Sequence, residues 1–448
     1  MVSGHRGGRG CVSDPAARPA EGRAGAPELL APAGTLRSLR YALAYGADAV
    51  YAGMPRYSLR VRNNDFHRLE TLATGIRETH ARGRRFYLAC NVLPHASKVR
   101  TFLADIAPVV ALAPDALIMA DPGLILMVRE RWPDLPVHLS VQANTMNAAA
   151  VKFWHQAGIQ RVILSRELSL DQVEEIRQAC PEVELEVFVH GALCIAYSGR
   201  CLLSGYFNHR DPNQGTCTNA CRWQYDLRPG RPEAEGEVVP AGEVYLLEER
   251  SRPGELMPVE EDEHGTYILN SRDLRAVEYV ARLVRIGVDC LKIEGRTKSH
   301  YYVARVTQAY RRAIDDAVAG RPFDPALLDM LDTLAHRGYT PGFFDRHPPQ
   351  RHQNYDCGRS ESRVQRFVGE IEGPPDARGM VEVAVKNKFA VGDRLALILP
   401  AGGRDFTLEA MEDLQGRPLV EAPGGGHRVR IPLGEGDYTL GLLARHLG

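Results

Sequence analysis

The stretch GVDCLKIEGR, residues 287–296, shows the pattern that decides the fold. A glycine or proline follows a helical segment, a polar residue comes next, and a short apolar run completes the pattern. The pattern recurs as GADAVYAG from Gly46, APDALIMAD from Ala113 and GIQRVILSREL from Gly158. Glycine tolerates the left-handed conformation that ends a helix, and proline cannot continue one. The apolar runs are continuous rather than alternating, which predicts strands buried on both faces of a parallel sheet.

Further apolar runs of the same kind are ELLAPAG from Glu28, RFYLACNVL from Arg85, VHLSVQANT from Val137 and ELEVFVHGAL from Glu184. Helical patterns separate the runs. Ser169 and Gln172, for instance, form a capping box ahead of an apolar stripe. Eight predicted strands that alternate with helices are typical of a (β/α)8, TIM-like α/β barrel. A doubly wound open sheet is the alternative.

The composition of the chain changes toward its C-terminus. QRFVGEIEG, GMVEVAVKN, DRLALILP, RDFTLEAM and HRVRIPL are short alternating runs separated by Gly and Asp turns, which predicts a small antiparallel β-barrel domain. The predicted parts are a disordered N-terminal extension over 1–26, the TIM-like barrel over 27–355 with a long cysteine-bearing insertion over 191–265 after its seventh strand, and the β-barrel domain over 360–448.

Charge and hydropathy narrow the class of protein. The formal net charge of the 448 residues is −1, so any binding of nucleic acid must come from a local patch. The sequence lacks a run of eighteen apolar residues, and its first 26 residues lack the apolar core of a secretion signal. We therefore expect a cytoplasmic protein without a membrane partner. In a reducing compartment, clustered cysteines indicate metal or redox chemistry more often than disulfides.

Four of the nine cysteines lie within Gly191–Trp223. They are Cys194, Cys201, Cys217 and Cys221. Cys194 follows the seventh predicted strand, at the barrel end where active sites lie. Four thiolates can hold an iron–sulfur cluster or zinc. The first spacing is too wide for a zinc knuckle, whereas a cluster accepts irregular spacing; zinc and unrelated buried or catalytic thiols remain alternatives.

Polar residues end several predicted strands. Arg56, Arg60 and Arg62 follow the second strand, where arginine suits carboxylate or phosphate, although a solvated basic loop is the alternative. Further residues of this kind are Gln142 and Asn144, which alternate at the fifth strand, Arg166 and Glu167, which end the sixth, and His190 at the end of the seventh. The histidine is a candidate proton carrier or a core residue.

The eighth predicted strand carries charges at alternate positions. Lys292, Glu294 and Arg296 should share one face that points into the barrel mouth. Because charges inside a barrel need partners, they indicate either a polar site or a structural ion pair. We interpret His190, Glu294 and Arg296 as candidate catalytic residues. The candidate residues for binding a cofactor or co-substrate are Arg56, Arg60, Arg62, Gln142 and Lys292.

The segment EVFVHGALCIAYSGRCLLS, Glu186 to Ser204, resembles the signature of family thirty-two of the unknown-mechanism (U) peptidases, the collagenase-like group. ELLAPAG, GADAVYAG and LKIEGR fit the family in the same order, so the resemblance runs from about Glu28 to the C-terminus. Within the family, RYSLRVRNN at Arg56, RDPNQGTCTNACRW at Arg210 and VKNKF at Val385 look most like the tRNA-hydroxylating branch.

This resemblance implies prephenate-dependent hydroxylation of the wobble uridine in the tRNA anticodon loop to 5-hydroxyuridine. It also implies a four-iron four-sulfur cluster on the clustered cysteines and prephenate as co-substrate. Because the chemistry is redox, an electron-donor protein is a further candidate partner. Sister branches act on ribosomal RNA cytidine or on a ubiquinone precursor. Some of them take a ligand from a later cysteine, where this chain has Arg275 in SRDLR. Cys221 is therefore the expected fourth ligand.

Two other classes of function, a peptidase and a non-catalytic RNA-binding protein, have less support in the residues. The collagenase-like name suggests a peptidase, yet the sequence lacks an H-E-x-x-H zinc helix and a G-x-S-x-G elbow. Four clustered cysteines also exceed what a catalytic Cys–His pair needs. A non-catalytic RNA-binding protein is disfavoured by the near-neutral charge and by the lack of RNP-like aromatic motifs.

Overall fold

The computed structural model of the chain describes residues 25–54, 56–59, 64–194, 196–201, 204, 217–218, 272–345, 362 and 364–447, and the backbone of six short strands between 230 and 266. Residues 1–24 of the predicted extension lie outside the described residues, as do Arg60, Arg62 and Cys221.

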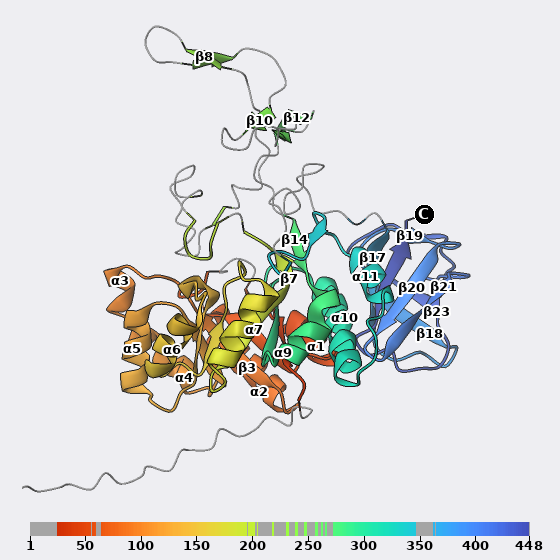
Figure 1. Ribbon diagram of the computed structural model, residues 1–448. Coiled ribbons are helices and arrows are strands. Elements are labelled where there is room, and N and C mark those ends of the chain that lie inside the picture. The colour runs from red at the N-terminus through yellow and green to blue at the C-terminus, as the bar shows by residue number, and fades with distance from the viewer. Residues whose placement is uncertain are drawn as a thin grey trace, which may run out of the picture.

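The first domain is a closed parallel barrel (Figure 1). Its strands are β1 (Glu28–Pro32), β2 (Ala49–Gly53), β3 (Arg85–Cys90), β4 (Ala116–Met119), β5 (Val137–Leu139), β6 (Arg161–Ile163), β7 (Glu184–Ala192) and β15 (Cys290–Ile293). β15 pairs in parallel with both β1 and β7, which closes the ring. All eight predicted strands are confirmed, and the closure excludes the open doubly wound sheet.

Helices surround the barrel (Figure 1). They are α1 (Leu36–Ala44), α2 (Leu69–His80), α3 (Ala96–Val99), α4 (Phe102–Val110), α5 (Pro122–Arg131), α6 (Ala148–Gln156), α7 (Leu170–Ala179), α9 (Val280–Ile286), α10 (His300–Val318) and α11 (Ala326–Asp332). The capping box of Ser169 and Gln172 at the start of α7 is confirmed. None of the described helices is long and apolar enough to cross a membrane.

The sequence pattern after the insertion predicts a helix from Asp273, and this prediction is wrong. Asp273–Arg275 forms strand β14, which pairs antiparallel with the end of β7 and parallel with β16 (Tyr339–Thr340). The carboxylate of Asp273 is buried and paired with Arg337 at 2.5 Å. This long-range pairing holds the backbone extended, so the helix begins only at α9.

The segment before β14 contains three short antiparallel hairpins (Figure 1). Their strands are β8 (Gly230–Pro232) with β9 (Val238–Pro240), β10 (Leu246–Glu248) with β11 (Leu256–Pro258), and β12 (Glu261–Asp262) with β13 (Gly265–Thr266). The sequence pattern did not predict these hairpins. They lie on the same side of the barrel as the end of β7, where the cysteine-bearing insertion begins.

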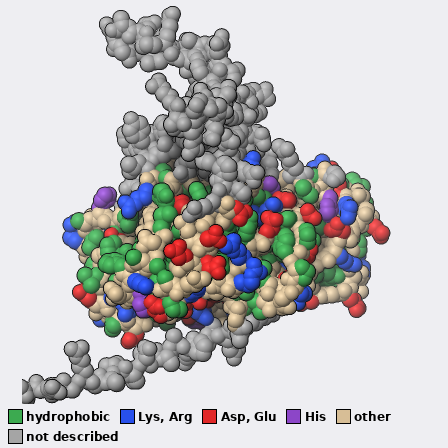
Figure 2. All heavy atoms as spheres, in the orientation of Figure 1, with side chains coloured by type: hydrophobic (Ala, Val, Ile, Leu, Met, Phe, Trp, Pro, Cys, Tyr) green, Lys and Arg blue, Asp and Glu red, His purple; other side chains and the backbone are tan. Residues whose placement is uncertain are grey.

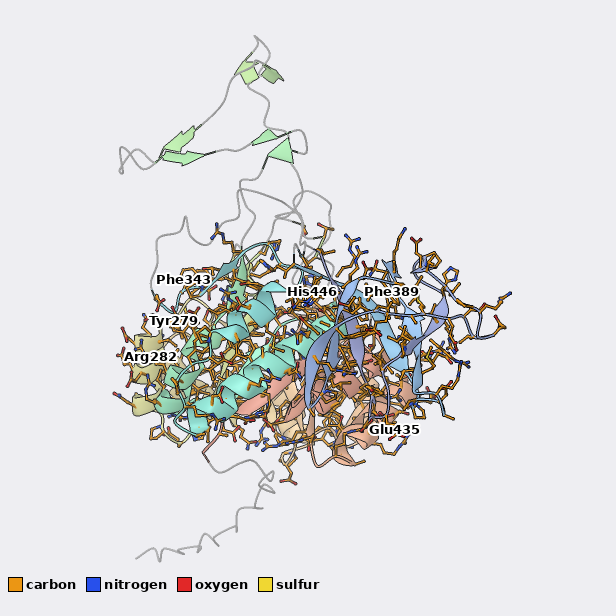
Figure 3. The ribbon with its side chains drawn as sticks, turned by 90° about the vertical axis from the view of Figure 1, so that its right-hand side faces the viewer. Tyr279, Arg282, Phe343, Phe389, Glu435 and His446 are labelled. Atoms are coloured by element: carbon orange, nitrogen blue, oxygen red, sulfur yellow. The ribbon has the colours of Figure 1, made fainter. Side chains whose placement is uncertain are left out.

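The second domain is an antiparallel sheet in the order β21-β20-β24-β17-β18-β23, which bears out the expected β domain. The strands of this sheet are β17 (Gln365–Glu372), β18 (Met380–Val385), β20 (Arg394–Leu399), β21 (Gly402–Thr407), β23 (Arg428–Pro432) and β24 (Leu442–His446), and β19 (Phe389–Ala390) pairs with β22 (Glu421–Ala422) in a separate two-stranded sheet. The sheet lies against α10 (Figure 3). Tyr45 of the barrel donates to the carbonyl of Ile398 at 3.1 Å, and Gln308 donates to that of Leu399 at 2.8 Å.

A buried carboxylate also joins the two domains. Glu370 on β17 is only 1% exposed and pairs with Arg37 of α1, His300 of α10 and Lys386. Burial alone would raise the pKa of Glu370. The hydrogen bond from His300 and the surrounding positive charges outweigh burial and lower this pKa below its usual value of 4.5. The carboxylate therefore stays charged in the folded protein.

We expect the substitution Glu370→Gln to lower the free energy of unfolding at pH 7 by about 1–3 kcal/mol, because exposed Arg37 and half-buried His300 and Lys386 lose their shared anionic partner. The folded pKa is depressed, so the contribution is complete above the usual Glu pKa and is lost as the pH falls through the lower folded value. Urea denaturation at several pH values measures both effects. Glu382→Gln, in a more exposed ion pair with Arg428, is the control; an equal loss in both variants would contradict the expectation.

Candidate active site at the barrel mouth

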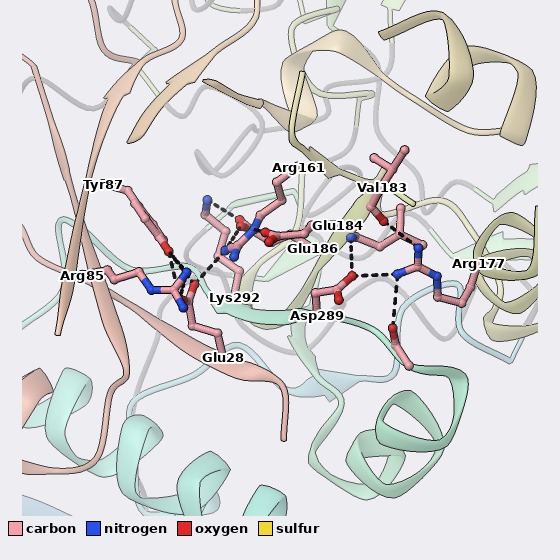
Figure 4. Close-up of polar contacts among 12 residues, drawn as sticks. Glu28, Arg85, Tyr87, Arg161, Arg177, Val183, Glu184, Glu186, Asp289 and Lys292 are labelled. Atoms are coloured by element: carbon pink, nitrogen blue, oxygen red, sulfur yellow. Dashed lines mark hydrogen bonds and ion pairs between the residues drawn. The ribbon is translucent and has the colours of Figure 1, made fainter. Parts of the chain in front are cut away.

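The barrel holds a network of paired charges that is buried at its centre and partly exposed at Glu184 and Arg85 (Figure 4). Its members are three carboxylates, Glu28, Glu184 and Glu186, and three cations, Arg85, Arg161 and Lys292. Glu186 is fully buried and lies 2.7 Å from the Nζ of Lys292 and 3.5 Å from Arg161. Burial opposes the charge of Glu28, but Arg161 and Arg85 lower its pKa. The three negative charges balance the three positive charges, so the network is neutral without a ligand. We therefore interpret this part of the barrel as structural core.

Two aromatic rings lie over this network. The Nζ of Lys292 is 4.4 Å from the ring centre of Tyr51 and 5.4 Å from that of Phe188. The Tyr51 hydroxyl donates to the carbonyl of Ile293 at 3.0 Å. Burial first, and then the charge of Glu294, raises the pKa of Tyr51, so its phenol stays neutral. The rings form an apolar floor beneath the residues that follow the strands.

The rim above this floor carries two arginines and a carboxylate. Arg166, after β6, pairs with Glu294 at 2.9 Å and donates to the carbonyl of Ala192 at 2.8 Å. Its guanidinium lies 3.9 Å from the ring centre of Phe188. Arg296 is buried and donates to the Oγ of Ser58 at 2.6 Å. Each rim side chain is therefore held in a fixed position by partners from another strand end.

Two glycines make room for these side chains. A Cβ on Gly53 would lie 2.3 Å from the Nη1 of Arg296. A Cβ on Gly191 would lie 2.7 Å from the Cβ and the carbonyl oxygen of Glu294, and Gly191 also has a φ of +114°. The ends of β2, β7 and β15 can therefore approach closely only because these positions lack a side chain.

The three charged residues of the eighth strand thus have different surroundings. Glu294 and Arg296 lie at the mouth, where the alternation placed them, and their catalytic roles stay predictions. Lys292 is instead paired with buried Glu186, which is the ion-pair alternative that the sequence left open. The sequence analysis did not identify Tyr51 and Phe188 as the floor of the site. The signal that could have identified them is an aromatic residue inside each of the two apolar runs.

His190 does not face the mouth. The register of β7 against β15 shifts after Lys292, so that His190 pairs with Ile293. Its ring, 1% exposed, packs against a cage of three tyrosines, Tyr302, Tyr310 and Tyr339, at ring-centre distances of 5.9, 5.5 and 5.4 Å. Burial lowers its pKa to about 3, with Asp273 acting in the opposite direction. These are the surroundings of a neutral core histidine, and a proton-carrier role stays a prediction.

Arg56, which follows β2 and was predicted to bind a carboxylate or phosphate of a ligand, instead forms an ion pair with a carboxylate of this protein. Arg56 adopts a φ of +69° and pairs with Asp105 of α4 at 2.9 Å. Both side chains are partly exposed, so this ion pair is one that a ligand anion can replace at low cost. Arg275 of the SRDLR segment pairs with Asp332 at 2.7 Å and lies over the ring of Tyr339.

Gln142 and Asn144 lie beyond the end of β5 (Val137–Leu139) rather than on the strand, and both lie beside the cysteine-bearing loop. Asn144, in the left-handed conformation after a 3₁₀ turn at Val141–Ala143, donates to the carbonyl of Ser198 at 2.6 Å. The next residue, Gly199, has a φ of +71°, and a Cβ there would lie 2.4 Å from the Oε1 of Gln142. The end of β5 thus fixes the loop between Cys194 and Cys201, and a role of Gln142 in ligand binding stays a prediction.

The described cysteines of this loop are accessible thiols. Cys194 is exposed, and Cys201 and Cys217 are half-buried. Ser204 donates to the Sγ of Cys217 at 3.8 Å. Among the described residues, which exclude Cys221, no three His, Cys, Asp or Glu side chains are gathered closely enough to hold a metal ion. The donor type fits an iron–sulfur cluster, but the described part of the chain does not display an assembled site.

We expect Gly199→Ala to release the loop from the end of β5, because alanine adds both φ strain and a clash with Gln142. Labelling of Cys201 by a thiol reagent, in metal-free protein under anaerobic conditions, should be about tenfold faster, as a strain of 1–3 kcal/mol implies. Gly320→Ala is the matched control, with a φ of +69° and open space around its Cβ. Equal labelling rates in the two variants would show that the contact with Gln142 does not hold the loop.

The fold and the site together define a (β/α)8 barrel protein with a charged mouth at the C-terminal ends of its strands and a cysteine-bearing insertion beside it. The chain belongs to peptidase family U32: residues 34–354 match that family, and 363–445 match the peptidase family U32 C-terminal domain.

Three relatives show the range of names within this family. The chain is 58% identical to tRNA hydroxylation protein P of Escherichia coli (strain K12), over 94% of this chain and 97% of that one. It is 29% identical to the 23S rRNA 5-hydroxycytidine C2501 synthase of the same organism, over 90% of this chain and 58% of that one. A collagenase of Porphyromonas gingivalis is 26% identical, over 91% and 95% of the two chains.

Proposed function

We propose that this protein hydroxylates tRNA and converts the wobble uridine to 5-hydroxyuridine with prephenate as co-substrate. The observation that carries the proposal is the 58% identity, over nearly the full length of both chains, to a protein named for tRNA hydroxylation. The more distant relatives named for ribosomal RNA or for collagenase activity are only 29% and 26% identical. The uridine C5 and the link to prephenate rest on the sequence resemblance.

The geometry of the mouth supports an anionic, partly planar ligand. A wobble base is already single-stranded in its loop, so it can be turned out of the stack at low cost. The mouth offers Arg166 and Arg296 against one carboxylate, Glu294, above the aromatic floor of Tyr51 and Phe188. Arginine suits the two carboxylates of prephenate as well as the phosphates of RNA. Fixed side chains of this kind orient a substrate rather than supply redox chemistry.

The redox chemistry is assigned to a cofactor. Cys194, Cys201, Cys217 and Cys221 would hold a four-iron four-sulfur cluster, which supplies one-electron transfer when it is bound. Zinc at the same thiolates is the alternative. The loop that carries the first two cysteines is fixed to the end of β5 by Asn144, so a bound group would lie beside the mouth.

Nucleoside analysis of tRNA tests the proposal. Cells that lack every tRNA 5-hydroxyuridine pathway, supplied with this chain, should regain 5-hydroxyuridine, and the gain should disappear when prephenate synthesis is blocked. Anaerobically purified protein should bind an anticodon stem-loop. Hydroxycytidine in ribosomal RNA without 5-hydroxyuridine in tRNA would place the protein in the sister reaction. Cleavage of a peptide by the metal-free protein would favour the peptidase.

A further inference from the structure

A cavity of about 480 Å³ lies where the barrel meets the C-terminal domain. The loop after β15 and the first turn of α10 line one side, and the start of β17 lines the other. The lining residues that matter here are Lys298, Ser299 and Tyr302 from the barrel, and Gln365, Arg366 and Phe367 from the second domain. The cavity therefore exists only because the two domains are docked.

The chemistry of this cavity suits an anion. Among the described residues that line it, two are cations, Lys298 and Arg366, and none is a carboxylate. Gln365 is 8% exposed, and its side-chain oxygen has no hydrogen-bond partner in the described part of the protein. Ser299 caps the 19-residue helix α10, whose N-terminus adds a partial positive charge. The cavity thus combines positive charge, which a phosphate would neutralise, with a buried amide oxygen, to which a hydroxyl or base-edge N–H of the attached nucleotide would donate.

The same loop borders the mouth. Glu294 and Arg296 face the mouth, whereas Lys298 and Ser299, a few residues further along, line the cavity. Tyr302 connects the two places, because it lines the cavity and its hydroxyl donates to the carbonyl of Glu294 at 2.9 Å. A small acid would occupy either the mouth or the cavity. A chain with regularly spaced negative charges, such as RNA, would occupy both.

We propose that this cavity binds a backbone phosphate of the RNA, next to the nucleotide that enters the mouth. The inference rests on the proposed function and deepens it. Lys298 and Arg366 donate to the phosphate, and Gln365 contacts the attached nucleotide. The C-terminal domain then has a direct part in substrate recognition, since it supplies half of the lining. On the face shown in Figure 2, acidic and basic side chains are mixed, which agrees with recognition through a local site rather than a broad basic surface.

Binding of a fluorescent anticodon stem-loop RNA, measured by anisotropy at several salt concentrations, tests the proposal. Lys298→Gln and Arg366→Gln together should weaken binding about tenfold, and each should reduce the salt slope by about 0.7, the value for one single-strand phosphate contact. Arg394→Gln is the matched control, because Arg394 is an exposed arginine of the same domain that does not line the cavity. Arg366→Gln alone carries the test where Lys298→Gln disturbs folding, since Arg366 is exposed.

Each outcome bears on the proposal. Unchanged RNA affinity and salt slope in the double variant would overturn it while leaving tRNA hydroxylation intact. A raised KM for prephenate with unchanged RNA affinity would also overturn it, and would assign the cavity to the small acid. Failure of the unsubstituted protein to bind or hydroxylate tRNA would instead reject the proposed function, so the two failures are distinguishable.

Discussion

Replacement of Cys201 by alanine is expected to abolish tRNA hydroxylation and to reduce bound iron from about four atoms per chain to below one. A methyl group cannot replace a thiolate ligand, and a cluster that loses a ligand also loses iron. Cys201 lies two residues after Gly199, next to the part of the loop that Asn144 ties to the end of β5. Iron, labile sulfide and EPR spectra of anaerobically purified protein measure the first effect. Nucleoside analysis of tRNA measures the second.

Cys180→Ala is the matched control for Cys201→Ala. Cys180 is fully buried at the end of α7, and its Sγ lies 3.5 Å from the carbonyl of Ala148. Its loss should cost about 1 kcal/mol of stability and leave iron and activity unchanged. Cys221→Ala in the same assays decides whether Cys221 is the fourth ligand. Hydroxylation by metal-free Cys201→Ala protein, or stoichiometric zinc in active protein, would overturn the redox assignment.

The barrel could be predicted because its signals are local. A continuous apolar run such as the one in β15, next to a glycine that ends a helix, is complete within ten residues of sequence. The strand β14 could not be predicted in this way. Asp273 begins a segment with a reasonable helical pattern, and only Arg337, 64 residues further along, reveals that its carboxylate is buried and its backbone extended. Pairing partners of this kind are invisible in one sequence.

The candidate site likewise has features that local sequence signals predict and features that depend on long-range pairing. Alternation placed Lys292, Glu294 and Arg296 on one side of the eighth strand, yet it could not show that Glu186, 106 residues away, neutralises Lys292. His190 was expected near the mouth because it ends the seventh predicted strand, but the register of β7 against β15 shifts there and its ring packs in the tyrosine cage. The sequence therefore identified the strand ends that form the mouth, and long-range pairing decided which side chains remain available there.

Breaking the buried ion pair of Lys292 and Glu186 is expected to have a large effect on stability. Lys292→Met is expected to lower the free energy of unfolding by about 3–5 kcal/mol, because it leaves the fully buried carboxylate of Glu186 with only Arg161, at 3.5 Å. Lys292→Met combined with Glu186→Gln should recover a large part of this loss, since no uncompensated charge then remains. Urea denaturation of both single variants and the double variant gives the coupling energy between the two residues.

Lys388→Met provides the matched control, because Lys388 forms an exposed ion pair with Glu421 at 2.7 Å, for which a change within about 1 kcal/mol is expected. Activity separates the two roles that the sequence allowed for Lys292. If the residue only supports the floor, the double variant regains hydroxylation together with stability, because Tyr51 and Phe188 return to their places. A double variant that is stable but inactive, or a Lys292→Met variant of unchanged stability without activity, would instead require that the ammonium group contacts the substrate or co-substrate directly.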